Sequence, residues 1–201
     1  MNHAAAVPAS HGEHPETATG LNTWKLGFWV LLGSETLFFG SLIATYMTYK
    51  GESVVGPYPH EILNIPLTTI STFVLLMSSF AMVLALAGVQ QGNRKQALIW
   101  LAMTAGLGAT FLAFQAYEFT EFYRHGLTLS TNLFGSTFFI LTGFHGAHVT
   151  VGVIWLTILW VMALRGRLGP GDALKVEVAG LYWHFVDVVW IAIFTLVYLL
   201  Q

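Results

Sequence analysis

Ionisable side chains stand inside long apolar stretches of this sequence, and they are the residues best able to do chemistry. His145 and His148 are three positions apart, His184 and Asp187 have the same spacing, and Glu35 stands alone. Placing such a group within a membrane costs roughly 2.5–3.5 kcal/mol on insertion scales. A sequence that keeps several of them therefore uses them to hold protons, to bind a ligand or to form buried hydrogen bonds.

Two acidic residues have different predicted environments. Glu35 lies between Lys25 and Lys50, with only apolar and small polar residues around it and no other basic residue in its stretch. A carboxylate buried without a cation is costly, so Glu35 is predicted to be buried and protonated at neutral pH. Glu118 stands near the end of another apolar stretch and is predicted to lie at the membrane interface.

The histidines and Asp187 have two interpretations. In the first they form buried polar contacts: His184 pairs with Asp187 through a charge-assisted hydrogen bond, and His145 and His148 are packed and hydrogen-bonded across a helix interface. In the second they bind haem, which requires His145 or His148 to face His184 across a haem-wide gap. The spacing H-G-A-H differs from the H-E-x-x-H of zinc peptidases. Neither a metal site nor a catalytic residue is predicted in this chain.

The composition excludes several classes of protein. Of the 201 residues, 55% are hydrophobic and 9% are charged, whereas soluble domains carry about 25% charged residues. The absence of cysteine excludes disulfides, iron–sulfur clusters, thiolate copper sites and c-type haem. A net charge of -2 argues against a nucleic-acid partner.

The apolar residues form five continuous segments after a polar N-terminal tail at residues 1–23. Because about 20 helical residues cross a ~30 Å hydrocarbon core, every segment can span a bilayer. The segments are continuous and do not alternate, which excludes a β-barrel. The predicted fold is an all-α polytopic membrane bundle at residues 24–201. Its five transmembrane helices lie at approximately 25–49, 66–91, 97–119, 133–164 and 178–200.

Basic residues predict the orientation of the bundle. Six of them fall at one side of the predicted membrane and two, Lys50 and Arg124, at the other. The excess of basic residues normally faces the cytoplasm, so the N-terminus is predicted inside and the C-terminus outside. The six are Lys25, Arg94, Lys95, Arg165, Arg167 and Lys175. From the residues alone, such a chain suits a subunit of a larger complex, a haem-binding membrane anchor or a small transporter.

Four motifs, in order, resemble subunit III of the haem–copper terminal oxidases, the cytochrome c and quinol oxidases. The family's S-E-x-x-F-F motif is matched by Ser34-Glu35-Thr36-Leu37-Phe38-Phe39. A polar turn is matched by Gly92-Asn93-Arg94-Lys95. The longest signature is matched by Phe134-Gly135-Ser136-Thr137-Phe138-Phe139 and Thr142-Gly143-Phe144-His145-Gly146-Ala147-His148-Val149. The C-terminal signature is matched by Tyr182-Trp183-His184-Phe185-Val186-Asp187-Val188-Val189-Trp190.

This resemblance implies a role in aerobic respiration. The complete oxidase reduces dioxygen to water and pumps protons, with haem and copper in subunits I and II. Subunit III carries no redox centre, packs on subunit I in the same complex as subunit II, and supports proton uptake and stability during turnover. Glu35 then corresponds to the family's buried glutamate, near a proton or lipid site.

The number of predicted helices indicates the bacterial form. The long form of subunit III has seven helices, and its N-terminal pair builds one wall of a cleft that binds phospholipid. The five helices predicted here are typical of a bacterial plasma membrane oxidase. Phospholipid bound near Glu35 would therefore need a wall from another subunit. The alternative function is a b-haem-binding anchor of another respiratory complex.

Overall fold

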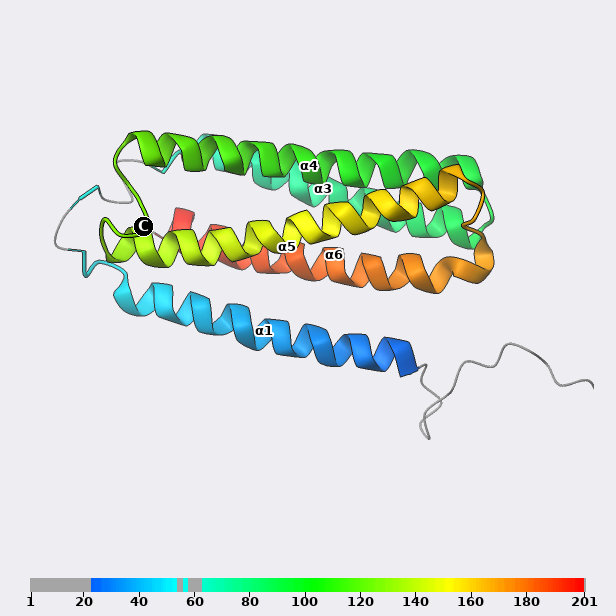
Figure 1. Ribbon diagram of the computed structural model, residues 1–201, viewed down its shortest axis with the longest axis horizontal. Helices are drawn as coiled ribbons and strands as arrows, with labels where there is room; N and C mark the ends of the chain where they lie inside the picture. The colour runs from blue at the N-terminus through cyan, green and yellow to red at the C-terminus, as the bar shows by residue number, and fades with distance from the viewer. Residues whose placement is uncertain (1–22, 54–55, 58–62, 201) are drawn as a thin grey trace, which may run out of the picture.

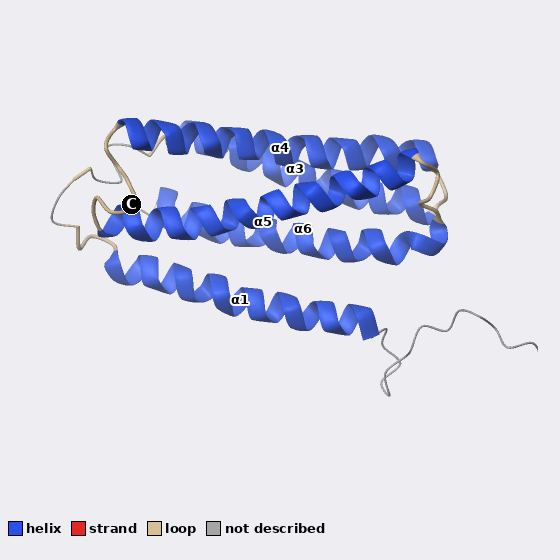
Figure 2. Cartoon of the chain, viewed as in Figure 1, coloured by secondary structure: helices blue, strands red, loops and turns tan. Residues whose placement is uncertain are grey.

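The computed structural model is a bundle of long helices that run back and forth along one axis (Figures 1 and 2). Residues 23–53, 56–57 and 63–200 are described, and none of them forms a strand. Five helices are long and apolar enough to cross a membrane, so the predicted fold class is confirmed. They are α1 (Thr23–Tyr49), α3 (Ile65–Gln90), α4 (Arg94–Arg124), α5 (Leu133–Leu164) and α6 (Ala173–Ile193).

The helix ends differ from the predicted segments where polar residues continue a helix. Helix α4 extends beyond the predicted segment 97–119 at both ends, and α6 begins before residue 178. A 3-10 turn, η1 (Pro170–Asp172), precedes α6, and a π-helical turn, η2 (Phe194–Leu199), follows it. The polar tail predicted for residues 1–23 lies outside the described residues except for Thr23, which begins α1.

Asparagine residues fix where three helices begin. The side chains of Asn64, Asn93 and Asn132 each accept a hydrogen bond from the backbone N–H three residues later, at 3.1, 3.2 and 2.7 Å. Such caps satisfy amides that have no partner inside the helix. Gly92, with φ 69°, allows the tight turn between α3 and α4. The turn returns the chain along α3 with few intervening residues.

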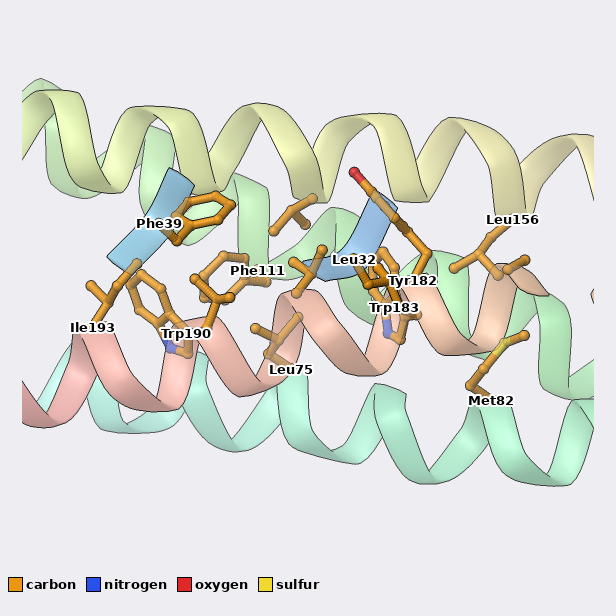
Figure 3. Close-up of a cluster of buried hydrophobic side chains, with 14 of the residues drawn as sticks. Leu32, Phe39, Leu75, Met82, Phe111, Leu156, Tyr182, Trp183, Trp190 and Ile193 are labelled. Carbon is orange, nitrogen blue, oxygen red and sulfur yellow. The ribbon is translucent and has the colours of Figure 1, made fainter. Parts of the chain in front are cut away.

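Trp183 fixes α6 at the centre of the bundle. Its ring is fully buried, and its indole Nε1 donates to Ser78 Oγ of α3 at 2.9 Å. A Cβ added at Gly108 of α4 or Gly152 of α5 would lie 2.5 or 2.7 Å from this ring. Glycine is therefore needed at both positions, and one tryptophan sets the spacing of four helices. Figure 3 shows Trp183 in the buried cluster, with Leu75 of α3 between it and Trp190.

Helix α1 lies at the edge of the bundle, where it packs mainly on α5 and, to a lesser extent, on α6 (Figure 1). It is the least buried of the five helices. Leu32 and Phe39 face the core, whereas Val30 and Leu37 are 68% and 78% exposed. Gly33 lies between these two exposed residues and has no neighbour within 4 Å of an added Cβ. The outer face of α1 is thus apolar and unpartnered among the described residues.

The six basic residues of the predicted cytoplasmic side gather at one end of the bundle. There Arg94 donates to the carbonyl oxygens of Ala163 and Leu164 at the end of α5, at 3.1 and 2.6 Å. Lys25 of α1 forms a 2.7 Å ion pair with Glu177 of α6. The chain therefore has one basic end, at which all five helices begin or end.

Candidate functional site

Glu35 of α1 and His148 of α5 meet in a groove on the side of the bundle. Oε2 of Glu35 lies 3.2 Å from Nε2 of His148, and their side chains are 26% and 20% exposed. The groove has a volume of about 380 Å³. Apart from these two residues and Tyr182, its lining is apolar: Leu31, Leu32, Phe144, Ala147 and Val151. A polar pair thus stands within a surface that otherwise suits hydrocarbon.

The hydrogen bonds of His148 determine what the pair can do. Nδ1 lies 2.8 Å from the carbonyl oxygen of Phe144, which only accepts, so Nδ1 carries a hydrogen. Nε2 then either accepts from a protonated Glu35 or, in an imidazolium, donates to a carboxylate. In both states one proton lies between the two side chains. The pair is therefore a proton-sharing site that faces the apolar groove.

This contact gives Glu35 a partner from outside its own stretch, in which the sequence analysis found no other basic residue. The partner is an imidazole 113 positions later in the sequence. It is held in place by the edge of the Phe39 ring, 4.9 Å away between centroids. The carbonyl oxygen of His148 also accepts a 3.0 Å hydrogen bond from the Tyr182 hydroxyl. That Glu35 is protonated stays a prediction.

A second groove continues from the first toward the basic end of the bundle. It has a volume of about 830 Å³ and shares Leu31 with the groove around Glu35. Phe28, Trp155, Ile158 and Met162 line it, and Lys175 lies at its margin. The two grooves thus adjoin at Leu31 beside α1 and α5, and most of the described residues that line them are apolar.

His145 is a core residue and lines neither of the two grooves. It is fully buried, and its Nε2 donates to the carbonyl oxygen of Val186 at 3.2 Å. Its ring lies 4.8 Å from the ring of Trp190 and meets the Phe111 ring edge-on. The predicted hydrogen bond across a helix interface is therefore present for His145, from α5 to α6.

His184 and Asp187 do not pair directly. Nδ1 of His184 lies 2.6 Å from the Ser79 hydroxyl of α3. Neither carboxylate oxygen of Asp187 has a hydrogen-bond partner among the described residues. The hydrogen bond of His184 is made instead to a hydroxyl of α3. The four residues predicted as one polar cluster thus occupy three environments: the groove, the core and the α3–α6 interface.

Glu118 lies inside the bundle, near the end of α4. Its depth at the membrane interface stays a prediction. Glu118 is 7% exposed. Its Oε1 accepts from the Thr68 hydroxyl at 2.9 Å and its Oε2 from the Tyr198 hydroxyl at 3.1 Å. These donors come from α3 and η2, so α4 is joined to both. The sequence analysis missed Ser79, Thr68 and Tyr198 because uncharged hydroxyl residues are common in membrane helices.

Metal ligands do not gather in the part of the chain that the structure describes. There, no three histidine, aspartate or glutamate side chains lie close enough to hold one ion. The ring nitrogens of His148 and one nitrogen each of His145 and His184 contact protein groups, as given above. The contacts made by these ring nitrogens are therefore hydrogen bonds to other groups of the protein.

Comparison with known proteins identifies the family. Residues 5–201 match the sequence model of "Cytochrome c oxidase subunit III". Cytochrome c oxidase subunit 3 of Alkalihalophilus pseudofirmus is 42% identical, over 98% of this chain and 98% of the relative. Quinol oxidase subunit 3 of Bacillus subtilis is 42% identical, over 87% and 86%. Cytochrome c oxidase subunit 3 of Bacillus sp. is 40% identical, over 98% and 94%.

These matches favour an oxidase subunit over a b-haem-binding anchor of another complex. They span nearly the whole chain, including the segments that carry Glu35, His148 and Asp187. The five helices that can cross a membrane agree with this assignment. The chain therefore belongs to the cytochrome c oxidase subunit III family and is a multi-pass membrane subunit of a haem–copper terminal oxidase.

Proposed function

We propose that this chain is a cofactor-free subunit of a proton-pumping terminal oxidase in a bacterial plasma membrane, where it packs directly on subunit I, in the same complex as subunit II. It supports proton uptake and the stability of the complex during turnover. The observation that carries this proposal is the proton-sharing contact of Glu35 with His148 in the side of the bundle.

The chemistry of the pair supports a role with protons. One proton lies between Glu35 and His148 in either charge state, and both side chains are partly exposed. The pair has no net charge while it holds this one proton, and taking up or releasing a proton leaves a single charge on a partly exposed site. Haem and copper are held by subunits I and II, so the dioxygen chemistry takes place outside this chain.

The grooves along α1 support contact with phospholipid. Apart from the Glu35–His148 pair and Tyr182 their lining is mostly apolar, and Lys175, which lines the second groove, can meet an anionic headgroup. Lipid hydrocarbon can fill such a surface because it has no hydrogen bonds to lose. The exposed outer face of α1 fits a neighbouring helix or lipid that closes the other side.

The electron donor does not alter this proposal. Relatives named cytochrome c oxidase subunit 3 and quinol oxidase subunit 3 match the chain at the same 42% identity. The features shared with both belong to the common role of subunit III. The donor is bound by other subunits.

The test compares the purified oxidase with and without this chain. Without it, the haem spectrum and initial turnover should be retained, while proton uptake falls and the enzyme inactivates faster. Glu35→Gln should slow proton uptake in the assembled complex. Ser34→Ala is the matched control, because the Ser34 hydroxyl is exposed and, among the described residues, bonds to the Leu31 carbonyl oxygen of its own helix. Loss of haem on removal of the chain would show instead a role in assembly.

A further inference from the structure

His184 of α6 is a polar side chain that lies near the middle of its span and is only partly buried. The apolar span to which it belongs runs from Pro170 to Leu199, and its partner Ser79 lies near the middle of α3. At about 1.5 Å per residue, either end of the span is roughly 20 Å from His184. Water and lipid headgroups are therefore distant, and hydrocarbon offers no hydrogen-bond partner at this depth.

The hydrogen bonds of this imidazole leave one ring nitrogen unsatisfied. Nδ1 lies 2.6 Å from the Ser79 hydroxyl, whose hydrogen has no other acceptor among the described residues, since neither oxygen of Asp187 bonds to it. The hydroxyl therefore donates to Nδ1, and the ring hydrogen of the neutral imidazole is on Nε2. Nε2 has no partner among the described residues and is accessible at the surface of the bundle. An unpaired N–H donor thus reaches the surface at mid-membrane depth.

The surface around this nitrogen, which we name the α3–α6 face, is otherwise apolar. It consists of His184 and of exposed side chains within two turns of it on α6 or one turn of its serine partner on α3: Val188, Ile191, Leu76 and Val83. None of these residues lines either groove beside α1. The α3–α6 face is therefore a separate surface from the one that carries Glu35 and His148.

Neither lipid nor a second copy of the chain satisfies the donor on this face. Acyl chains have no acceptor, and an unpaired polar group in hydrocarbon is costly. Two copies inserted in the same direction would meet at equal depth, so the N–H of one would face the same N–H of the other. A different helix that carries an oxygen acceptor at this depth satisfies the donor, and its side chains can pack on the apolar residues around it.

We propose that the α3–α6 face packs against a transmembrane helix of another subunit of the oxidase, and that Nε2 of His184 donates a hydrogen bond to that helix. The acceptor is a side-chain oxygen, because carbonyl oxygens in the middle of a helix are already bonded within it. The inference rests on the proposed function and names the side of the chain that meets the complex. It uses neither Glu35 nor His148.

The first test measures how readily the chain dissociates from the purified oxidase as the detergent concentration is raised. His184→Phe removes the donor, and the Ser79 hydroxyl can then turn to a carbonyl oxygen of its own helix. Dissociation should become about 3- to 30-fold more favourable, as expected for the loss of one hydrogen bond between helices in a membrane. His184→Gln keeps a side-chain N–H and should recover part of this loss. His125→Phe is the matched control and should change nothing, because that exposed imidazole bonds to a backbone carbonyl of its own helix.

The second test leaves His184 intact. A photo-crosslinking residue at Val188, a position that is 63% exposed, should form a covalent product with another subunit in the assembled oxidase. A product with lipid alone, or with a second copy of this chain, would overturn the inference. This cross-link also decides the question if His184→Phe fails to assemble.

The two proposals fail in different ways. If the wild-type chain does not co-purify with the other oxidase subunits, the proposed function is wrong. If it co-purifies, but His184→Phe is retained as well as the wild type and Val188 cross-links to no other subunit, only the inference about the α3–α6 face is wrong. It is also wrong if His184→Phe destabilises the isolated chain as much as it weakens retention and no subunit is cross-linked, because His184 then acts within the bundle.

Discussion

At the scale of single residues, hydroxyl groups of α3 hold polar side chains of the neighbouring helices inside the bundle. Thr72 accepts from the Trp190 indole at 2.9 Å, and Thr68 donates to Glu118 at the same distance. Lipid offers no hydrogen-bond partner, so buried polar groups are stabilised by partners within the protein. A short hydroxyl on one helix is therefore enough to position a tryptophan or an acid on another.

Tyr198→Phe tests this at Glu118. The change removes the donor to Glu118 Oε2 and keeps the shape of the side chain. Because a buried acceptor is then unsatisfied, the free energy of unfolding should fall by about 1–3 kcal/mol. The measurement is unfolding of the purified chain in detergent. Tyr123→Phe, at a side chain that is 72% exposed, should change it by less than about 0.5 kcal/mol. Equal effects would show that the Tyr198 hydroxyl does not stabilise the fold.

At the scale of the helices, glycine and tryptophan determine how closely α4, α5 and α6 approach. Trp183 fills the space that Gly108 and Gly152 leave. Its indole nitrogen is bonded to Ser78, so the ring cannot move aside without losing that bond. The position of α6, and with it those of His184 and Asp187, therefore depends on one side chain that contacts three other helices.

Gly108→Ala should destabilise the bundle. The added Cβ would lie 2.5 Å from the Trp183 ring and 2.9 Å from Val153. Overpacking of this kind costs about 1–3 kcal/mol. Gly106→Ala on the same helix has nothing within 4 Å of the added Cβ, so it should leave stability unchanged or slightly raise it, as alanine favours helix over glycine. Unfolding in detergent compares the two, and a similar loss for both would reject the packing argument.

The sequence is sufficient to predict the helices but not all of their ends. Apolar length alone identifies five spans, because a bilayer imposes that length. The apolar pattern misses the first turn of α4, because the residues of that turn are polar. Asn93 caps this turn. From the sequence, Glu35 and His148 are identified as two separate candidate residues. Their contact depends on packing between α1 and α5, and Ser79 carries no charge that would distinguish it from other serines before its neighbours are known.

At the scale of the whole molecule, the two ends of the bundle differ in charge. Helix α1 begins at the basic end, and the turn between α3 and α4 and the connection between α5 and α6 also lie there (Figure 1). Arg94 joins two of these segments by bonding to the last carbonyls of α5. The opposite end has Lys50 and Arg124. This asymmetry predicts that the basic end of the bundle faces the cytoplasm, since basic loops normally remain on that side.

Labelling of single cysteines tests that direction, and the natural absence of cysteine leaves no background. Lys95→Cys places a thiol at the basic end, and Ser130→Cys places one in the connection between α4 and α5 at the other end; both positions are exposed. A maleimide that cannot cross membranes should label Ser130→Cys in intact cells stripped of their wall, and Lys95→Cys only in inside-out vesicles. The reverse pattern would place the basic end outside. In that orientation the groove beside Lys175 would open toward the outer leaflet, and its proposed phospholipid contacts would belong to that leaflet.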